Sequence, residues 1–528
     1  MHSSKDVKQL TNDQLHTLVD EARAALLQKL SVHGGHNGPN LGVVEMTVAL
    51  HAVFDSPTDK IIYDVSHQSY VHKMLTGRAQ AFLDPAHYDD VSGYTNPKES
   101  DDDFFSIGHT STSLALASGF IKARDVLGNH ENIVAVIGDG SLSGGLAYEG
   151  LNNVVTENSN AIVIVNDNDQ SIAKNPTGGI YTALRKLRES NGQAEANHEK
   201  FHAGGPIDLK TGDYKGAGQP AGETYDAVLS DLVFNKLKQD RSVIALSSGT
   251  PMIIFNQEQR QAAGAQFMDV GIAEEQATTM SAALAKYGAK PVYPVYATFL
   301  QRAYDELSHD VALNNDPATL LVYLAGAYGM NDESHLGLYD IPFLSHIPNF
   351  VYLAPTNKEE LVAMTNWAID QPDHPVAIRV PAVALETAGQ ADTTDYGDLN
   401  KNQVVHQGSK VAIFGVGNLL GLAKQAAAKL AEEGVDATVI NPRYLTGLDT
   451  ELLDQLQADH QVVVTLEDGI LEGGYGQTIA SYLGDSAVRV QNYGLQKAYP
   501  DRYDVNELLA QNGLTADNIA QQALKALN

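Results

Sequence analysis

The chain has 528 residues, 43% of them hydrophobic and 19% charged, which is typical of a globular protein too long for a single core. A formal net charge of -30 argues against nucleic acid or an anionic membrane as partner, although a metal or a helix N-terminus can still hold an anionic ligand. Because the sequence contains no cysteine, disulfides, thiolate catalysis and Cys-ligated metal sites are excluded.

The first 30 residues combine a polar cap with an amphipathic pattern and predict a helix. They contain no apolar core of the kind found in signal peptides, and no later apolar run approaches the length of a membrane span. We therefore expect a cytoplasmic protein that has no membrane as a partner.

Residues 1–191 alternate helical patterns with short apolar runs, which predicts βαβ units around a parallel sheet. The clearest predicted strands are Ile133–Ile137 and Asn160–Asp167. Residues 192–222 are rich in Gly, Pro and polar residues and predict a linker or mobile loop.

Helix and strand patterns resume after this segment, with a second polar break at Glu386–Gln403. We therefore expect two further α/β domains, at residues 223–390 and 391–528. In the last domain Gly415-Val416-Gly417 suggests a dinucleotide-binding loop, but position 420 is Leu420 where that motif requires glycine. We predict a plain strand-to-helix turn there.

The turn Gly138-Asp139-Gly140 follows the first of these strands directly. Asp139 could cap the following helix, which is the more ordinary interpretation of the turn alone. The next predicted strand, however, ends in Asn166-Asp167-Asn168, so two neighbouring strands end in oxygen ligands. Ligands of open α/β sheets collect at such strand ends, and magnesium takes oxygen ligands together with phosphate. Gly140 would let the backbone approach a diphosphate, and the next helix N-terminus would offer amides to it.

A Gly-Asp-Gly turn followed at this separation by Asn is the pattern of thiamine-diphosphate enzymes. Further stretches resemble 1-deoxy-D-xylulose-5-phosphate synthases, namely Gly34–Arg78, Phe104–Gly119, Met268–Ala285, Tyr296–Leu313 and Ser334–Asn349. The resemblance covers nearly the whole chain, including a transketolase-type C-terminal domain around Thr465–Gly476. It implies three α/β domains of transketolase type: two thiamine-diphosphate-binding domains with mainly parallel sheets, and the C-terminal domain.

The resemblance also implies a set of functional residues and the cofactors thiamine diphosphate and Mg²⁺. The implied metal ligands are the side chains of Asp139 and Asn168 and the carbonyl of Gln170. The other implied cofactor contacts are His67, Gly108, His109, Thr110, Gly140, Ser141, Glu274 and Phe299, together with Asn168. The implied catalytic residues are Glu274, His36, His335, Arg302 and Tyr296.

Glu274 matches the glutamate that activates the cofactor in this family. A carboxylic acid hydrogen-bonded to the aminopyrimidine promotes the tautomer that removes the thiazolium proton, and burial keeps this acid protonated. The ordinary alternative for a lone Glu is a solvated helix face, but Glu274 stands among small and apolar residues.

The other implied residues have distinct roles in the same site. Phe299 would stack on the pyrimidine, and His36 and His335 would transfer protons, which suits imidazole near neutral pH. Tyr296 and Arg302 would hold the carboxylate of the donor or the acceptor. For His72 and His309 we expect structural roles.

The sequence departs from the family pattern mainly at the acceptor site. The family's Arg-Ala-Gly segment reads Leu324-Ala325-Gly326 here, and its Arg-x-Pro-Arg segment ends in Ala382. Two arginines that bind the acceptor's phosphate are therefore missing, which costs roughly 3–6 kcal/mol of binding. Asn331 replaces an aspartate, and Asp332 and Glu333 add negative charge.

Two further departures concern the catalytic helix and the linker. Glu275-Gln276 stand where the family has Gln-His. The linker is shorter than in the family, Gln219 occupies a tyrosine position, and a substrate-site histidine has no counterpart.

The resemblance implies a transferase that decarboxylates pyruvate or a similar 2-keto acid and adds the two-carbon unit to an aldehyde, in isoprenoid biosynthesis. The missing arginines argue against glyceraldehyde 3-phosphate as the acceptor. One alternative is a transketolase-like ketol transfer or a carboligase with another aldehyde, and another is a catalytically silent thiamine-diphosphate-binding paralogue. The expected partners are small-molecule substrates and a second copy of the chain in a homodimer.

Overall fold

A computed structural model of the protein describes residues 3–156, 159–168, 178, 184 and 223–527. The chain divides into two compact units, Met1–Gln219 with Gly271–Ala273 and Pro220–Val270 with Glu274–Asn528. The predicted linker at 192–222 lies outside the described residues, and the predicted domain boundaries remain predictions.

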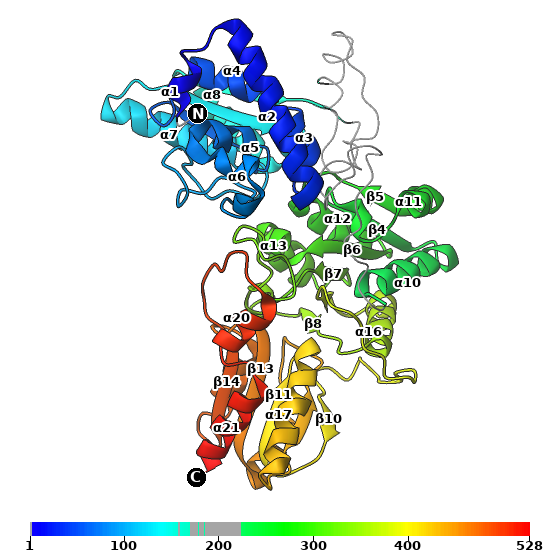
Figure 1. Ribbon diagram of the computed structural model, residues 1–528. Coiled ribbons are helices and arrows are strands. Elements are labelled where there is room, and N and C mark those ends of the chain that lie inside the picture. Colours follow the sequence, from blue (N-terminus) through cyan, green and yellow to red (C-terminus); the bar gives the residue numbers. More distant parts are fainter. Residues whose placement is uncertain (1–2, 157–158, 169–177, 179–183, 185–222, 528) are drawn as a thin grey trace. The chain divides into compact units, whose positions relative to one another are not determined.

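The first unit, coloured blue to cyan in Figure 1, contains a three-stranded parallel sheet in the order β1-β2-β3. Its strands are β1 (Lys60–Tyr63), β2 (Ile133–Gly138) and β3 (Ile162–Asn166). The apolar central strand β2 is buried up to Ile137, as expected for a parallel strand covered on both faces. Both strands predicted from the sequence are confirmed, and the register pairs Gly138 with Asn166.

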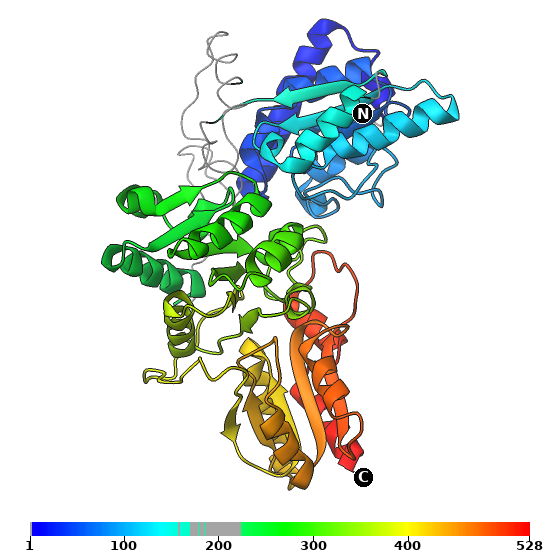
Figure 2. The ribbon, with the colours of Figure 1, turned by 180° about the vertical axis from the view of Figure 1, so that it is seen from behind.

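Helices surround this sheet, and the predicted N-terminal helix is present as α2, which begins with a capping box between Thr11 and Gln14. Helices α7 and α8 pack closely (Figure 2). Gly150 on α8 allows this approach, since a Cβ atom there would lie only 2.5 Å from the Ala115 nitrogen on α7. The helices and single turns are α1 (Ser4–Val7), α2 (Asn12–His33), α3 (Asn37–Leu41), α4 (Val44–Val53), α5 (Tyr70–Lys73), η1 (Met74–Arg78), α6 (Gln80–Leu83), η2 (Pro85–His87), α7 (Ser113–Leu127), η3 (Ser141–Ser143) and α8 (Gly145–Thr156).

The second unit contains two sheets, of which the first is six-stranded and parallel in the order β5-β4-β6-β7-β9-β8. Its strands are β4 (Val243–Ser247), β5 (Phe267–Asp269), β6 (Lys290–Tyr296), β7 (Thr319–Tyr323), β8 (Val351–Leu353) and β9 (Val376–Val380). Its helices and turns are α10 (Tyr225–Gln239), η5 (Pro251–Ile253), α11 (Gln257–Ala263), η6 (Gly264–Gln266), α12 (Glu274–Lys286), α13 (Ala297–Leu300), η7 (Gln301–Ala303), α14 (Tyr304–Glu306), η8 (Leu307–Ala312), α15 (Asp340–Ser345) and α16 (Lys358–Asp370).

The second sheet of this unit is mixed, in the order β10-β12-β11-β13-β14 with only β10 antiparallel. Its strands are β10 (Gln403–His406), β11 (Lys410–Gly415), β12 (Thr438–Asn441), β13 (His460–Ile470) and β14 (Arg489–Leu495). Its helices and turns are η9 (Gly417–Leu419), α17 (Leu420–Glu432), α18 (Thr450–Asp459), α19 (Tyr475–Tyr482), α20 (Val505–Gln511) and α21 (Ala516–Leu527). The plain turn predicted at Gly415-Val416-Gly417 is confirmed, because it joins β11 to η9 and α17.

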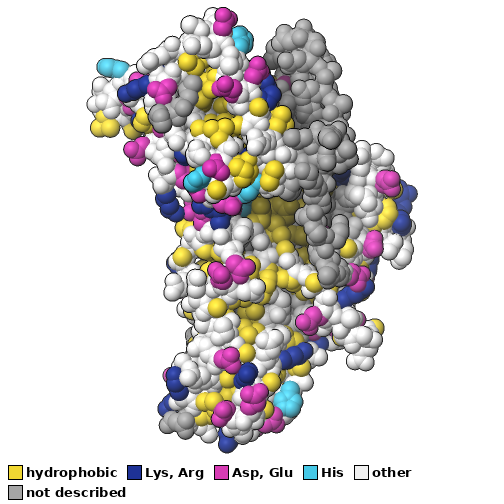
Figure 3. Space-filling model, viewed as in Figure 1, with side chains coloured by type: hydrophobic (Ala, Val, Ile, Leu, Met, Phe, Trp, Pro, Cys, Tyr) yellow, Lys and Arg dark blue, Asp and Glu magenta, His cyan; other side chains and the backbone are white. Residues whose placement is uncertain are grey.

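Buried ion pairs tie the two sheets of the second unit together. Arg379 on β9 lies 2.7 Å from Asp340 and 2.5 Å from Asp468 on β13. Arg443 lies 2.9 Å from Glu360 on α16. On the face shown in Figure 3, charged side chains of both signs are scattered rather than gathered in one patch. No helix in the described ranges is long and apolar enough to cross a membrane.

Candidate active site

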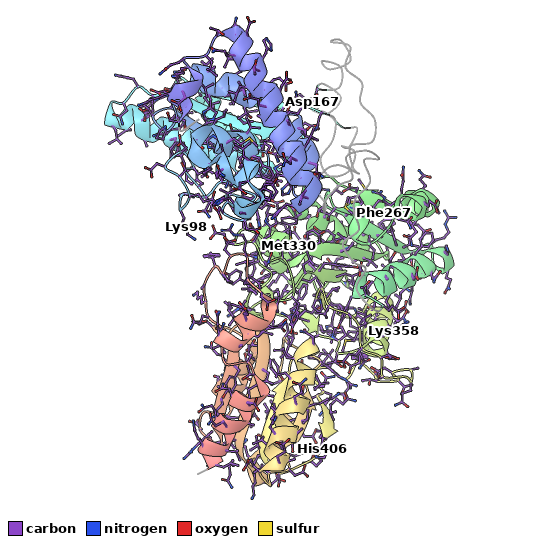
Figure 4. The ribbon with its side chains drawn as sticks, viewed as in Figure 1. Lys98, Asp167, Phe267, Met330, Lys358 and His406 are labelled. Atoms are coloured by element: carbon purple, nitrogen blue, oxygen red, sulfur yellow. The ribbon has the colours of Figure 1, made fainter. Side chains whose placement is uncertain are left out.

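The carboxyl ends of β2 and β3 meet at one edge of the first unit's sheet. The N–H of Asp139, directly after β2, donates to the Asn166 carbonyl at the end of β3 over 3.1 Å. Asp139 is buried, and Asn168 is half-buried two residues beyond β3, next to Asp167 (Figure 4). The predicted juxtaposition of the two strand ends is therefore confirmed. The third predicted metal ligand, Gln170, lies outside the described residues.

The structure excludes one of the two interpretations of Asp139 that the sequence left open, namely that it caps helix α8. Helix α8 begins only at Gly145, so Asp139 does not stand at its N-cap position. The predicted helix N-terminus next to Gly140 is a single 3₁₀ turn, Ser141–Ser143. The described residues contain no group of three His, Cys, Asp or Glu side chains that could hold a metal. The predicted site would not form such a group, because its ligands are one carboxylate, one amide and one carbonyl. Mg²⁺ takes few protein ligands when phosphate and water complete its coordination.

Asp64, which follows β1, fixes the turn that contains Gly108-His109-Thr110. Its two carboxylate oxygens accept the N–H groups of Ser111 and Ser113, each over 2.9 Å, and it is fully buried. The other end of the turn is held by Ser66, whose hydroxyl donates to the Ile107 carbonyl over 3.2 Å. The predicted cofactor-binding turn is thus rigidly held at both ends.

Ser111 joins this turn to the one that follows β2. Its hydroxyl donates to the Ser141 carbonyl over 2.8 Å, and its backbone is left-handed with φ of 74°. A Cβ atom on Gly144 would lie 2.1 Å from the Ser111 hydroxyl, so glycine is required there. We call Asp64, the 107–113 turn and the 139–144 turn the strand-end cradle.

His36 and His67 lie next to each other in the first unit. Their ring centroids are 5.1 Å apart, and the Tyr94 ring centroid lies 5.5 Å from that of His36. The Asn40 amide donates to the carbonyls of both histidines over 2.8 and 2.7 Å. The structure therefore brings these two predicted residues together, and Asn40 orients the backbone of both.

Glu274 is the first residue of α12 in the second unit and is only 2% exposed. Burial raises its pKa to about 7, although the nearby Arg302 guanidinium opposes this shift. One Arg302 nitrogen lies 3.4 Å from a Glu274 carboxyl oxygen. A carboxyl with this pKa retains much of its proton near neutral pH, as the predicted role requires.

Aromatic rings connect three more of the predicted residues. Phe299 lies 5.5 Å from Tyr296 and 5.6 Å from His335 between ring centroids, the latter in an edge-to-face arrangement. Burial raises the pKa of Tyr296 to about 12, so its hydroxyl keeps its proton. Glu274, Arg302, Tyr296, Phe299 and His335 all belong to the second unit.

A loop from Leu324 to Gly337 carries several of the departures from the family pattern, and Met330 marks its middle in Figure 4. Leu324 adopts a left-handed conformation with φ of 56°, and Gly326 is bridged to Gly337. A Cβ atom on Gly337 would lie 2.0 Å from the Leu324 carbonyl oxygen, so the loop closes tightly at its base. Strained non-glycine backbone of this kind is concentrated at functional sites.

The loop also orients His335, which is 6% exposed. Its Nδ1 lies 2.8 Å from the Ser334 hydroxyl, which in turn is hydrogen-bonded to Asp332. Asp332 therefore makes contacts of its own rather than merely adding charge, a role that sequence analysis missed.

The remaining arginine of the acceptor segment is occupied elsewhere. Arg379 is buried between Asp340 and Asp468, so it holds the fold together. Leu324 packs against an apolar cluster, and Ala382 is exposed with its N–H bonded to the Tyr328 carbonyl. None of these three positions therefore offers a guanidinium group to a phosphate of the acceptor.

The two remaining histidines differ from each other. His72 is buried and bonded to His51 and Asp103 over 2.9 and 3.0 Å, as expected for a structural residue. His309 is largely exposed and pairs with Asp305. Asp64 was missed by sequence analysis, although it follows an apolar run just as Asp139 does.

Three family models match consecutive parts of the chain. They are 1-deoxy-D-xylulose-5-phosphate synthase over residues 1–237, the transketolase pyrimidine-binding domain over 227–386 and the transketolase C-terminal domain over 400–519. The sequence is 34% identical to the 1-deoxy-D-xylulose-5-phosphate synthase of Symbiobacterium thermophilum, over 98% of this chain and 93% of the relative. The chain belongs to this family. The corresponding enzyme of Heliobacterium modesticaldum is 35% identical over 98% of this chain and 94% of its own length.

Membership of this family establishes a thiamine-diphosphate-dependent transferase that works with a divalent metal. A solved structure, a split-gene transketolase in an inactive β4 tetramer, matches 58% of this chain with a TM-score of 0.51 and 22% identity. The transketolase-type fold expected from the sequence is confirmed. The alignment with the Symbiobacterium relative spans 614 positions, more than the 528 residues of this chain, so the relative carries segments that are absent here.

Proposed function

We propose that this chain binds thiamine diphosphate through a magnesium ion held by Asp139 and Asn168, cleaves pyruvate or a similar 2-keto acid, and adds the two-carbon unit to an aldehyde. The observation that carries the proposal is the buried Glu274 with a pKa of about 7. A carboxyl that is protonated near neutral pH can donate a hydrogen bond to a ring nitrogen, as the activation of this cofactor requires.

The strand-end cradle, together with Asn168 beyond β3, fits a diphosphate and its metal. Asp139 offers a buried carboxylate, and Asn168 offers an amide oxygen at the end of the neighbouring strand. Gly140, without a side chain, allows close approach of an anion, and the adjacent turn is fixed by Asp64. Two protein side chains are a typical number for Mg²⁺ that also binds phosphate.

When bound, thiamine diphosphate supplies an electron sink for the cleavage of a 2-keto acid. The chain supplies the surrounding groups. Glu274 holds a proton, and His36 and His335 exchange protons with the substrate. Arg302 is mostly buried and 3.4 Å from Glu274, and its guanidinium can hold a carboxylate.

We further propose that the acceptor aldehyde carries no terminal phosphate. Leu324 and Ala382 stand at the family's two phosphate-binding positions and cannot donate side-chain hydrogen bonds. Arg379 does not replace them, because two carboxylates already hold it. An unpaired phosphate next to the half-buried apolar side chain of Leu324 would be costly.

Calorimetry with thiamine diphosphate tests the metal assignment. We expect Asp139→Ala or a chelator to weaken cofactor binding about 100-fold, the equivalent of losing roughly 3 kcal/mol. Asp167→Ala is the matched control, because it removes a carboxylate from the same strand end and is expected to change affinity far less. Unchanged affinity in Asp139→Ala and with chelator would overturn the assignment.

Product analysis by mass spectrometry tests the reaction. The chain is incubated with labelled pyruvate and a panel of phosphorylated and unphosphorylated aldehydes, and we expect labelled two-carbon adducts of the unphosphorylated ones. Adducts from ketose phosphates but not from pyruvate would favour the transketolase-like alternative. Cofactor binding without any product would favour a silent paralogue.

The family resemblance also supports a homodimer in the cytoplasm. Sedimentation of the full chain tests the oligomeric state, and a monomer at micromolar concentration would contradict the homodimer.

A further inference from the structure

In the 324–337 loop, the side chains of Asp332, Ser334 and His335 form a hydrogen-bonded chain. The Ser334 hydroxyl is bonded to Asp332 Oδ1 and lies 2.8 Å from His335 Nδ1. Asp332 Oδ1 itself lies 3.8 Å from the same ring nitrogen. The aspartate therefore acts on the imidazole mainly through the serine.

The donors and acceptors in this chain can be assigned from the chemistry of the groups. Burial raises the pKa of Asp332, but its interactions with His335 and Ser334 outweigh burial and lower the pKa overall. An ionised carboxylate only accepts, so the serine hydroxyl must donate to it. The serine oxygen then accepts the Nδ1–H of His335, which leaves the lone pair of the neutral imidazole on Nε2.

The same loop is fixed from outside by the segment between β14 and α20. The Arg502 N–H donates to the Asn331 carbonyl over 2.6 Å, and the Glu333 N–H donates to the Asp501 carboxylate over 3.4 Å. The Asn331 amide donates to the Tyr503 carbonyl over 3.2 Å. The loop is thus anchored, so Asp332 and Ser334 can hold the imidazole in one orientation.

His335 also has an aromatic neighbour outside its own loop. Its ring lies edge to face with Phe299, 5.6 Å away, on the segment that follows β6. The charged groups on the neighbouring elements are Asp332 and Glu333 on its own loop, Asp501 and Arg502 on the anchoring segment, and Arg302, three residues after Phe299 and paired with Glu274. Asp332 and the neutral Ser334 both lie next to the imidazole Nδ1.

We propose that Asp332 and Ser334 are positioning residues for His335, which keep its proton on Nδ1 and direct Nε2 to the proton transfers of the reaction. The proposal rests on the proposed function in that it uses His335 as a proton-transfer group. No covalent step is involved, since a proton only moves between Nε2 and the substrate. In this proposal Asp332 orients His335, a role beyond the added negative charge that the sequence indicated.

A turn-forming aspartate is the competing explanation, because Asp332 Oδ1 also accepts the Ser334 N–H over 2.9 Å and its carbonyl accepts the His335 N–H over 3.0 Å. Asp332→Asn separates the two roles. Asparagine keeps an oxygen that can accept the backbone N–H and form the same turn, but it has no charge to orient the serine hydroxyl.

The first measurement is independent of activity. Nitrogen NMR of the full chain labelled with ¹⁵N-histidine reports which ring nitrogen carries the proton, and His335→Gln assigns the signal. We expect the Nδ1–H form in the wild type and a mixture of tautomers in Asp332→Asn and Ser334→Ala. A wild-type tautomer in both variants would overturn the proposal, even if the proposed reaction itself were wrong.

The second measurement is the pH profile of pyruvate turnover. We expect kcat to fall about 10- to 100-fold in Asp332→Asn and Ser334→Ala, with the pyruvate KM within about 2-fold. The pH limits of kcat should move in Asp332→Asn, whereas Ser334→Thr should restore both kcat and profile. Glu333→Gln removes a negative charge from the residue next to Asp332 and should leave the pH profile of kcat unchanged.

An equal shift in Glu333→Gln would mean that unspecific charge, and not the hydrogen-bonded chain, controls the histidine. An unchanged kcat and pH profile in Asp332→Asn would reduce Asp332 to a turn former and overturn the proposal. If the wild type turned over no donor at all, the proposed function would fail while the NMR measurement still decided the positioning role.

Discussion

The strand-end cradle of the first unit and the 324–337 loop of the second are built in different ways. In the cradle, the buried Asp64 side chain holds the backbone N–H groups of Ser111 and Ser113, and the turns follow directly from parallel strands. In the loop, side chains hold one another, as in the Asp332–Ser334–His335 chain, and Leu324 tolerates a left-handed backbone.

This difference matches the ligands that the two regions are proposed to bind. A diphosphate and its metal are the same in every thiamine-diphosphate enzyme, so the geometry that holds them follows from the fold itself. An acceptor substrate differs between enzymes, and a long loop on a rigid scaffold can change its side chains without changing the sheet. The family pattern is accordingly retained at Asp139 and lost at Leu324.

Replacing Glu274 should produce the largest effect, because it removes the acid that activates the cofactor. We expect Glu274→Gln to lower kcat roughly 1000-fold while the cofactor still binds measurably by calorimetry. Proton exchange at the thiazolium C2, followed by NMR after acid quench, should slow to a similar degree.

Glu275→Gln is the control for this variant, because it changes the neighbouring carboxylate to the residue that the family has there. It should leave C2 exchange close to that of the wild type. Wild-type exchange in Glu274→Gln would show that another group activates the cofactor.

The strands and strand ends were predictable because burial imposes a simple pattern on the sequence. Apolar runs such as Ile133–Ile137 predicted β2, and the polar residues after them predicted where the edges of the sheet meet. The identity of the cofactor site came from resemblance rather than from this pattern, since a lone Gly-Asp-Gly is equally consistent with a helix cap.

Long-range pairing could not be predicted in the same way. Arg379 meets Asp340 and Asp468 only because β9, α15 and β13 come together in the folded chain. Asp332 and His335 are close in the sequence, but the proposed role of their contact depends on how the ring is oriented. That orientation involves Phe299 and the anchoring segment, which are distant in the sequence. Asp64 carried a visible signal in its position after an apolar run, and was overlooked.

Restoring the two missing arginines should produce the next largest effect and tests the loop directly. We expect Leu324→Arg combined with Ala382→Arg to raise kcat/KM for glyceraldehyde 3-phosphate about 100-fold. This is less than the full value of two charge-assisted hydrogen bonds, because Leu324 packs against an apolar cluster and arginine must leave it. Steady-state kinetics with pyruvate as donor measure the change.

The gain should be selective for the phosphate. Unphosphorylated glyceraldehyde should gain little, and Leu313→Arg, which adds a positive charge at an exposed position, should change neither substrate's kcat/KM. If the wild type already used glyceraldehyde 3-phosphate best, another basic residue would have to bind the phosphate and the two-arginine argument would be wrong.

Asp64→Asn should produce the smallest of these effects and tests how the cradle is held. Asparagine offers one acceptor oxygen where aspartate offers two, so one of the buried N–H groups of Ser111 and Ser113 loses its partner. An unsatisfied buried donor costs about 1–3 kcal/mol of unfolding free energy. Thermal unfolding should therefore shift to lower temperature, and thiamine diphosphate affinity should fall because the Gly108-His109-Thr110 turn loosens.

Asp59→Asn is the matched control, because it removes the same kind of interaction at the opposite end of the sheet. One Asp59 oxygen accepts the Asn132 N–H over 2.8 Å just before β2, and the other accepts the Asp55 N–H over 2.7 Å. Both variants should lose similar stability, but only Asp64→Asn should lose cofactor affinity beyond that loss. Equal affinity in the two variants would mean that the 107–113 turn takes no part in holding the cofactor, and the cradle would then be confined to the ends of β2 and β3.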